Sequence, residues 1–382
     1  MQRWIIVTFI LSITWTFILY TTYSYCHHPQ VLFIPHLCLC LVNKSVYPFS
    51  TKQLSPIIHH RHYTFFLSFF LFIYMDIKSN VTYLILGGFV DMNKYRYVYF
   101  FLMFTVYVLI MCSNCIIVYL ILIHKNLHEP MYVFIAALSF NSVLFSTVIY
   151  PKLLIDFLSE KQIISMPACI FQYFIYYSLA MSDMLLLAAM AFDRYVSICK
   201  PLQYPTIMRK STVNVLLFLC WLWPAAHMIG GVTLGGFKKL CSVTLTGIFC
   251  NNSILKLKCV PSAALAIYGV VNLIYLGLLP VLFVLFTYAK IFIITHKRGR
   301  EVRKKAAETC LPHLMILFSF FCVAAYDIII ARVESNFSKT VRLVMTLQII
   351  LYNPLLNPII YGLKMKEILK HLKKLFCQIT QR

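Results

Sequence analysis

Three ionisable residues lie in one otherwise apolar segment, and they are the side chains best placed to do chemistry. Asp183, Asp193 and Arg194 all fall within residues 167–199. In a helix, the step from Asp183 to Arg194 is roughly 1100°, about 20° from whole turns, so the two share a face. Charged groups in such surroundings need partners and mark functional sites by default. The alternatives are a plain anchoring ion pair for Asp193–Arg194 and a protonated structural hydrogen bonder for Asp183.

Four of the 14 cysteines have a spacing that favours disulfide chemistry. Cys241, Cys250 and Cys259 are evenly spaced between two apolar runs, and Cys169 lies at the start of another. In an oxidising compartment, four thiols suggest two bridges, for which three pairings exist. Free thiols in a loop are the alternative.

The composition places these residues in a membrane protein. The 382 residues are 61% hydrophobic and 12% charged, whereas a soluble domain carries about 25% charged residues. A net charge of +22 would suggest nucleic acid in a soluble protein, but here it is expected to follow membrane topology, and we expect no nucleic-acid partner. The histidines and acids are too scattered for H-E-x-x-H or a similar arrangement. We therefore expect no enzyme, no cofactor and no metal site.

Seven apolar segments are long enough, or nearly so, to cross a bilayer. A spanning helix needs about 20 predominantly apolar residues, and these segments lack the period-two alternation of strands. The sequence therefore predicts an all-α membrane protein, a bundle of seven transmembrane helices over residues 97–123, 131–157, 167–199, 213–234, 264–295, 310–330 and 340–362.

Basic residues predict the direction of the bundle. The loop after the fifth segment reads HKRGREVRKK, and the loop after the third segment and the tail are also basic. These three stretches lie on one side, which the positive-inside rule makes cytoplasmic. Glycosylation sequons at Asn80, Asn251 and Asn336 all fall on the opposite side, as glycosylation requires.

The third segment ends in a sequence that resembles the odorant-receptor signature. It reads MAFDRYVSICKPLQY from Met190 to Tyr204. The other family motifs also occur in order along the chain. LHEPMY at 127–132, PK at 151–152 and IS at 164–165 precede this signature, and KAAETCLPHL at 305–314 and LNPIIY at 356–361 come after it. From about Met75 onward, the chain resembles a fish-type odorant (olfactory) receptor of the rhodopsin-like (class A) G-protein-coupled receptor family.

This resemblance implies a receptor that binds a small odorant outside the cell. Inside, it would activate a heterotrimeric G protein of the olfactory stimulatory type and raise cAMP. Its expected location is the plasma membrane of sensory cilia of olfactory neurons. One alternative is a rhodopsin-like receptor for a non-odorant small ligand, which need not carry the LHEPMY and KAAETCLPHL motifs. The other is a polytopic transporter, although the internal repeats and broken helices typical of transporters are not seen here.

The resemblance also implies which residues switch the receptor. Asp193 would hold Arg194 at rest, and release would let Arg194 engage the G protein and Tyr288. A proline in the seventh span frees a carbonyl that must find another donor, which makes a plausible hinge. The expected switch residues are Asp193, Arg194, Tyr195, Tyr288, Asn357, Pro358 and Tyr361.

The ligand pocket and the disulfides are assigned by position in the family. The pocket candidates are Tyr176, Tyr177, Ala180 and Met181 in the third span, with Tyr326 and Asp327 near the outer end of the sixth. Aromatic and methionine side chains on a membrane helix more often serve packing. The family's pairing implies a Cys169–Cys250 bridge, which leaves Cys241–Cys259.

One position departs from the family's pattern. Rhodopsin-like receptors usually carry an aspartate four residues after the residue that matches Leu138. Here that position is Ser142, with Asn141 before it, which puts the usual intramembrane sodium site in doubt. The intramembrane acid of this chain is instead Asp183, where odorant receptors commonly have an acid.

The two ends of the chain differ in kind. Residues 363–382 predict a cytoplasmic amphipathic helix and tail, with a basic face suited to anionic membrane lipid. Cys377 there is a palmitoylation candidate or a free thiol. Residues 75–96 read as a short extracellular segment before the receptor domain, 97–362. Residues 1–74 have no counterpart in the family, and we interpret them as disordered or as an artefact of start-site choice, with a genuine signal-anchor leader as the alternative.

Overall fold

The computed structural model describes most of the receptor domain. The described residues are 83–235, 240–259, 263–297, 299–301, 303–304, 307, 310–311, 313–318 and 338–380. Five subjects of prediction lie outside them, namely the leader 1–74 and the residues Asn80, Tyr326, Asp327 and Asn336.

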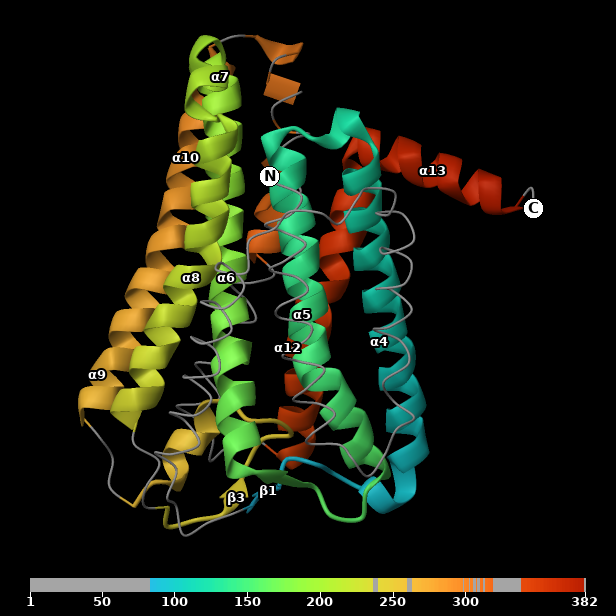
Figure 1. Ribbon diagram of the computed structural model, residues 1–382, viewed down its shortest axis with the longest axis vertical. Coiled ribbons are helices and arrows are strands. Elements are labelled where there is room, and N and C mark those ends of the chain that lie inside the picture. Colours follow the sequence, from blue (N-terminus) through green and yellow to red (C-terminus); the bar gives the residue numbers. More distant parts are fainter. Residues whose placement is uncertain are drawn as a thin grey trace, which may run out of the picture.

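Six long helices stand side by side in the described part of the chain (Figure 1). By length and composition each can cross a membrane, and they span Lys94–Ile123, Pro130–Leu158, Met166–Cys199, Lys210–Leu234, Ala263–His296 and Lys339–Gly362. These helices confirm six of the seven predicted segments. The other segment, 310–330, is described over 310–311 and 313–318, and those residues are helical.

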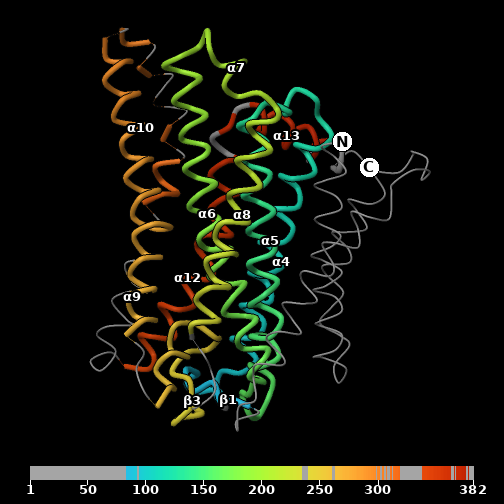
Figure 2. Tube along the Cα trace, turned by 60° about the vertical axis from the view of Figure 1, so that its left-hand side comes forward, coloured from blue at the N-terminus to red at the C-terminus, as the bar shows by residue number. Residues whose placement is uncertain are grey.

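The helices of the described part of the chain divide into long helices and short ones at the two ends of the bundle. The long helices are α4 (Met92–Ile123), α5 (Pro130–Leu158), α6 (Met166–Cys199), α8 (Lys210–Gly235), α10 (Leu279–His296) and α12 (Lys339–Lys364). α9 (Ala263–Asn272) and the π-helical stretch η5 (Leu273–Leu278) lead into α10 as one column (Figure 2). The end of the bundle with the loops predicted to be extracellular is called the outer end, and it lies at the bottom of Figure 1. The inner end carries η2 (Lys125–Leu127), η3 (Pro201–Gln203), α7 (Tyr204–Ile207) and α13 (Lys366–Thr380), and the outer end carries η4 (Asn252–Leu257).

Local sequence sets where several of these helices begin. Pro130 is in the first turn of α5 and Pro167 in that of α6, where a missing backbone N–H costs nothing. Ser338 precedes α12, and its hydroxyl accepts a hydrogen bond from the N–H of Val341 at 3.3 Å. That bond satisfies one of the unpaired donors at the start of the helix.

Two prolines inside α12 remove backbone donors from that helix. Pro354 leaves the carbonyl of Ile350 without its helical partner, and the hydroxyl of Tyr150 in α5 donates to that carbonyl at 3.4 Å. Pro358 does the same to the carbonyl of Pro354, which accepts from Nδ2 of Asn114 in α4 at 2.8 Å. Because an unpaired carbonyl in lipid costs several kcal/mol, these bonds hold α12 against α4 and α5.

A three-stranded sheet covers the outer end of the bundle. Its order is β2 (Ile163–Ser165), β1 (Tyr83–Leu86) and β3 (Thr244–Leu245). β1 runs antiparallel to β2, with Leu84 opposite Ile164, and parallel to β3, with Leu86 opposite Leu245. These four side chains are buried in one cluster, and the residues that alternate with them along β1 are exposed. The residues just before the first span are therefore the centre of an outer cover.

The close approach of β1 to the outer loop after β3 generates a stability prediction. A Cβ atom on Gly88 would lie 2.5 Å from the carbonyl carbon of Gly247, whereas one on Gly269 in α9 meets nothing within 4 Å. We expect Gly88→Ala to cost about 1–3 kcal/mol, as overpacking does, and to lower both the thermal unfolding midpoint of the purified receptor and its display at the cell surface. Gly269→Ala is the matched control and should stay within about 0.5 kcal/mol of the parent. Equal midpoints for the two variants would contradict the described contact.

Candidate functional site

An ion pair at the inner end of α6 is largely shielded from water. Arg194 donates to Oδ2 of Asp193 from Nε at 2.9 Å and from Nη2 at 2.5 Å, and the side chain of Asp193 is 0% exposed. The hydroxyl of Tyr204 in α7 donates to Oδ1 of Asp193 at 2.8 Å. Burial and the negative charge of Asp193 raise the pKa of Tyr204, so the phenol stays a donor at neutral pH. Tyr204 was not among the predicted switch residues, although it ends the signature motif.

Other spans bring polar side chains to the same end. Tyr361 of α12 and Nδ1 of His313, in the sixth span, lie 3.1 Å apart. The hydroxyl of Tyr288 in α10 is buried and has no hydrogen-bond partner among the described residues. The positive charge of Arg194 lies within electrostatic reach of both Tyr288 and His313. Tyr195 is half-buried and packs against a cluster of buried apolar residues that includes Met131 and Val196. His313 is not among the switch residues predicted from the sequence, although it lies within the KAAETCLPHL motif.

Asp183 lies in the middle of the bundle, bonded to an amide. Nδ2 of Asn141 in α5 donates to Oδ1 of Asp183 at 2.7 Å and to the carbonyl of Leu179 at 2.9 Å. The indole Nε1 of Trp221 in α8 donates to Oδ1 of Asn141 at 3.0 Å. Asn141 therefore joins three spans at the depth of the buried acid.

The residue that replaces the usual second-span aspartate bonds to α12 instead. Nδ2 of Asn357 donates to Oγ of Ser142 at 3.1 Å, and that hydroxyl donates to the carbonyl of Leu138 in its own helix at 3.1 Å. Oδ1 of Asn357 is buried and unpaired among the described residues. Pro358 follows Asn357 within α12. Asn357 thus faces α5, at the residue that follows Asn141 in the sequence, whereas Tyr361 faces the sixth span.

Two disulfides tie down the outer loop. They join Cys169 to Cys250 and Cys241 to Cys259, with Cα atoms 5.3 and 4.8 Å apart, which is the pairing that the family resemblance implies. Gln172 in α6 adds a second connection, because its Oε1 accepts from the N–H of Cys250 at 3.0 Å. No motif in the sequence marks Gln172 as a contact of this loop.

The predicted third-span pocket residues lie beneath that loop. They are Tyr176, Tyr177, Ala180 and Met181, of which Tyr176 is buried and the others are half-buried. The ring centroid of Tyr176 is 4.9 Å from that of Phe249 in the outer loop. The hydroxyl of Tyr177 accepts from the N–H of Asn252 at 3.1 Å. Tyr176 and Tyr177 therefore contact the loop, and their role toward a ligand stays a prediction.

The sequon at Asn251 lies at the start of η4. Oδ1 of Asn251 accepts from the N–H of Ser253 at 3.1 Å and from its hydroxyl at 2.7 Å. The asparagine side chain thus caps the short helix. Glycosylation at Asn251, as at the other two sequons, stays a prediction.

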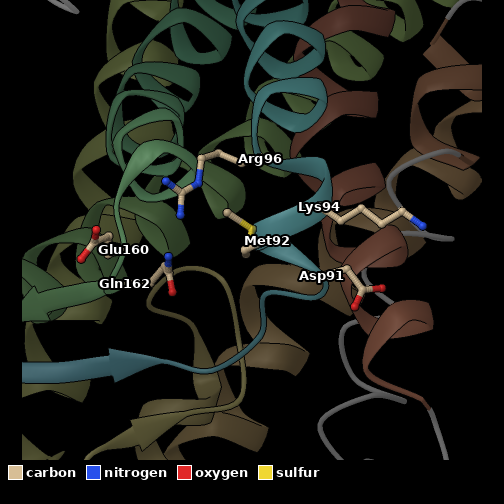
Figure 3. A pocket seen from close by; sticks show the side chains of 6 residues that line it. All are labelled: Asp91, Met92, Lys94, Arg96, Glu160 and Gln162. Carbon is tan, nitrogen blue, oxygen red and sulfur yellow. The ribbon is translucent and has the colours of Figure 1, made fainter.

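A cavity of about 400 Å³ opens at the outer ends of α4 and α5 (Figure 3). It is lined by Asp91, Met92, Lys94, Arg96, Glu160 and Gln162. None of the predicted pocket residues that the structure describes lines it, and its lining is mostly charged.

The arrangement of spans is that of the rhodopsin-like receptors. A crystal structure of squid rhodopsin superposes with a TM-score of 0.58 at 20% sequence identity, covering 76% of this chain and 87% of that chain. The family model described as "Olfactory receptor" matches residues 103–379. Together they define the class, a G-protein-coupled receptor of class A, which is a multi-pass membrane protein and not an enzyme.

Individual relatives agree with that family. The chain is 32% identical over 293 residues to mouse Olfactory receptor 4B13, 33% over 300 residues to human Olfactory receptor 4N5 and 34% over 307 residues to mouse Olfactory receptor 4E2. These alignments cover 76%, 78% and 78% of this chain and 95%, 96% and 97% of the relatives. The chain belongs to the olfactory receptor family. These three relatives are mammalian, so the fish-type resemblance stays a prediction.

The bonds of Asn141 generate a second stability prediction. Asn141→Ala removes the amide donor of Asp183 and the acceptor of Trp221. Because each buried polar group left unpaired costs about 1–3 kcal/mol, we expect a clear fall in the thermal unfolding midpoint. Thr105→Ala is the control, since that hydroxyl donates to a carbonyl of its own helix on an exposed face. The interpretation is wrong if both variants unfold at the temperature of the parent.

Proposed function

We propose that this receptor binds a small odorant at its outer end and activates a heterotrimeric G protein of the olfactory stimulatory type at its inner end, raising cAMP. Its location is the plasma membrane of olfactory sensory cilia. The observation that carries the proposal is one face of α6. Tyr176, Asp183 and Arg194 lie on it, since successive steps of 7 and 11 residues each end within about 20° of whole turns. Ligand contact, the buried acid and the coupling arginine therefore share one rigid element.

At rest, Arg194 is held by the ion pair with Asp193. Tyr204 satisfies the other oxygen of the carboxylate, which supports a closed state, since a buried charge needs both pairing and hydrogen bonds. Activation breaks the contacts of Arg194, and the arginine then faces the G protein. Tyr288, whose hydroxyl is unpaired among the described residues, is positioned to accept Arg194 as a new partner.

The movement of α12 accompanies this release. Two of its contacts are single hydrogen bonds between side chains, Asn357 to Ser142 and Tyr361 to His313. Net hydrogen bonds of this kind contribute about 0.5–1.5 kcal/mol each, so a ligand's binding energy is sufficient to exchange them. Pro358 lies between Asn357 and Tyr361 in the sequence and serves as the hinge. Asn357 and Tyr361 therefore act as the mobile part of the switch.

The inner membrane surface holds α13 in this proposal. Ile368 is buried against the bundle, and the ring of His371 stacks on that of His124, with centroids 3.8 Å apart. Burial, followed by electrostatic interaction with His371 and Lys374, lowers the pKa of His124. Lys370, Lys373 and Lys374 of α13 are exposed, which suits them to anionic lipid.

Expression with a cAMP reporter tests the proposed function. We expect a rise in cAMP with at least one member of a panel of amino acids, amines and bile-type compounds. Arg194→Ala should abolish that response while the protein remains at the cell surface. Tyr204→Phe should raise basal cAMP several-fold because Asp193 loses a donor, whereas Tyr97→Phe, at a residue 67% exposed on α4, should not. Silence of the wild type to the whole panel despite surface display would count against the proposal.

Asp183 is tested separately by a nearly isosteric change. Asp183→Asn keeps the shape of the side chain and its acceptor for Asn141 but removes the ionisable group. We expect a several-fold change in basal or ligand-evoked cAMP, with surface display unaltered. If signalling is unchanged, the acid is a structural hydrogen bonder and not part of the switch.

A further inference from the structure

The outer cavity has charges of both signs that do not pair with each other. Its lining includes two cations and two anions, Lys94, Arg96, Asp91 and Glu160. Among the described residues, no ion pair joins Arg96 to Glu160. Figure 3 shows the guanidinium of Arg96 on the same side as Glu160 and Gln162, whereas Lys94 and Asp91 extend the other way. The cavity thus presents one cation, one anion and one amide to a common space.

The two cations of α4 lie on different faces of the helix. A step of seven residues is roughly two turns, so residues seven apart share a face of the helix. Arg96 shares the face of Met103, which is 2% exposed, and Lys94 shares the face of Phe101, which is 63% exposed. Phe101 is on the face suited to lipid. Arg96 is therefore on the buried side of α4, and Lys94 is on the side where lysines extend toward the membrane interface.

The amide of Gln162 is fixed by the end of α5. Its Nε2 donates to the carbonyl of Ser159 at 2.9 Å and to that of Asp156 at 3.3 Å. Those two bonds use the donors of the amide. Among the described residues the oxygen Oε1 accepts no hydrogen bond. Glu160 lines the same cavity, so both residues supply acceptors for a ligand that donates hydrogen bonds.

We propose that this cavity binds a small zwitterion with one carboxylate and one ammonium group, the chemistry of a free α-amino acid. Arg96 binds the carboxylate, because a guanidinium offers two parallel donors to a carboxylate. Glu160 and Oε1 of Gln162 bind the ammonium group. The ligand's side chain lies toward Met92. This site is distinct from the third-span residues of the proposed function and does not depend on them.

The experiment measures binding directly and not signalling. Full-length receptor in nanodiscs of phosphatidylglycerol, a lipid without an ammonium group, is titrated with L-leucine and observed by saturation-transfer NMR. N-acetyl-L-leucine lacks the ammonium group, and L-leucinamide lacks the carboxylate. We expect each of these two probes to bind at least about tenfold more weakly than L-leucine, a difference of about 1.4 kcal/mol.

Matched variants assign the contacts. Arg96→Gln should weaken L-leucine binding at least about tenfold, and Lys94→Gln, two residues away on the other face, should leave it unchanged. Glu160→Gln, on an exposed loop residue where misfolding is not expected, should remove the preference for L-leucine over its N-acetyl form. Thermal unfolding of each variant checks that it is folded. Absence of L-leucine binding to the wild type, or equal binding of all three probes, overturns the proposal, and neither outcome bears on cAMP coupling.

Discussion

Inside a bilayer no water replaces a lost backbone hydrogen bond, so a proline within a spanning helix requires a donor from a neighbouring helix. α12 contains two such prolines, and its carbonyls at Ile350 and Pro354 are satisfied by Tyr150 and Asn114. These bonds fix the position and rotation of α12 relative to α4 and α5. The contacts of the rest of α12, from Asn357 to its inner end, depend on that placement. A helix weakened from within is thus stabilised from outside.

Asn141 has a comparable role between α5, α6 and α8. It neighbours Ser142, where the family usually has an aspartate, and it binds the acid that this chain carries on α6. The carboxylic acid and its amide partner therefore come from adjacent spans. Ser142 in turn accepts from Asn357, which brings the contacts of α12 and of α6 to consecutive residues of one helix. Movement of α6 or of α12 would therefore change contacts at the same turn of α5.

The sequence was sufficient for the six spans that the structure describes, because each is a local run of apolar residues. The signature motif and the position of Asp183 were readable for the same reason, as properties of one segment. Contacts between distant segments were not readable. Nothing in the sequence relates Gln172 to Cys250 or Trp221 to Asn141. Tyr204, whose hydroxyl donates to the second oxygen of Asp193, was also not predicted, although it lies within the signature motif. The charged cavity also combines two separate segments, residues 91–96 and 160–162, which nothing in the sequence relates to each other.

The central position of β1 in the outer sheet has a consequence for biosynthesis. β1 precedes the six spans that the structure describes, but one of its neighbours, β3, follows about 160 residues later. At about 5–20 residues per second, that interval is on the order of ten to thirty seconds. During this time β1 lacks the partner on one of its two edges. The outer cover is therefore completed only after the four described spans that lie between β1 and β3, namely α4, α5, α6 and α8, have been made.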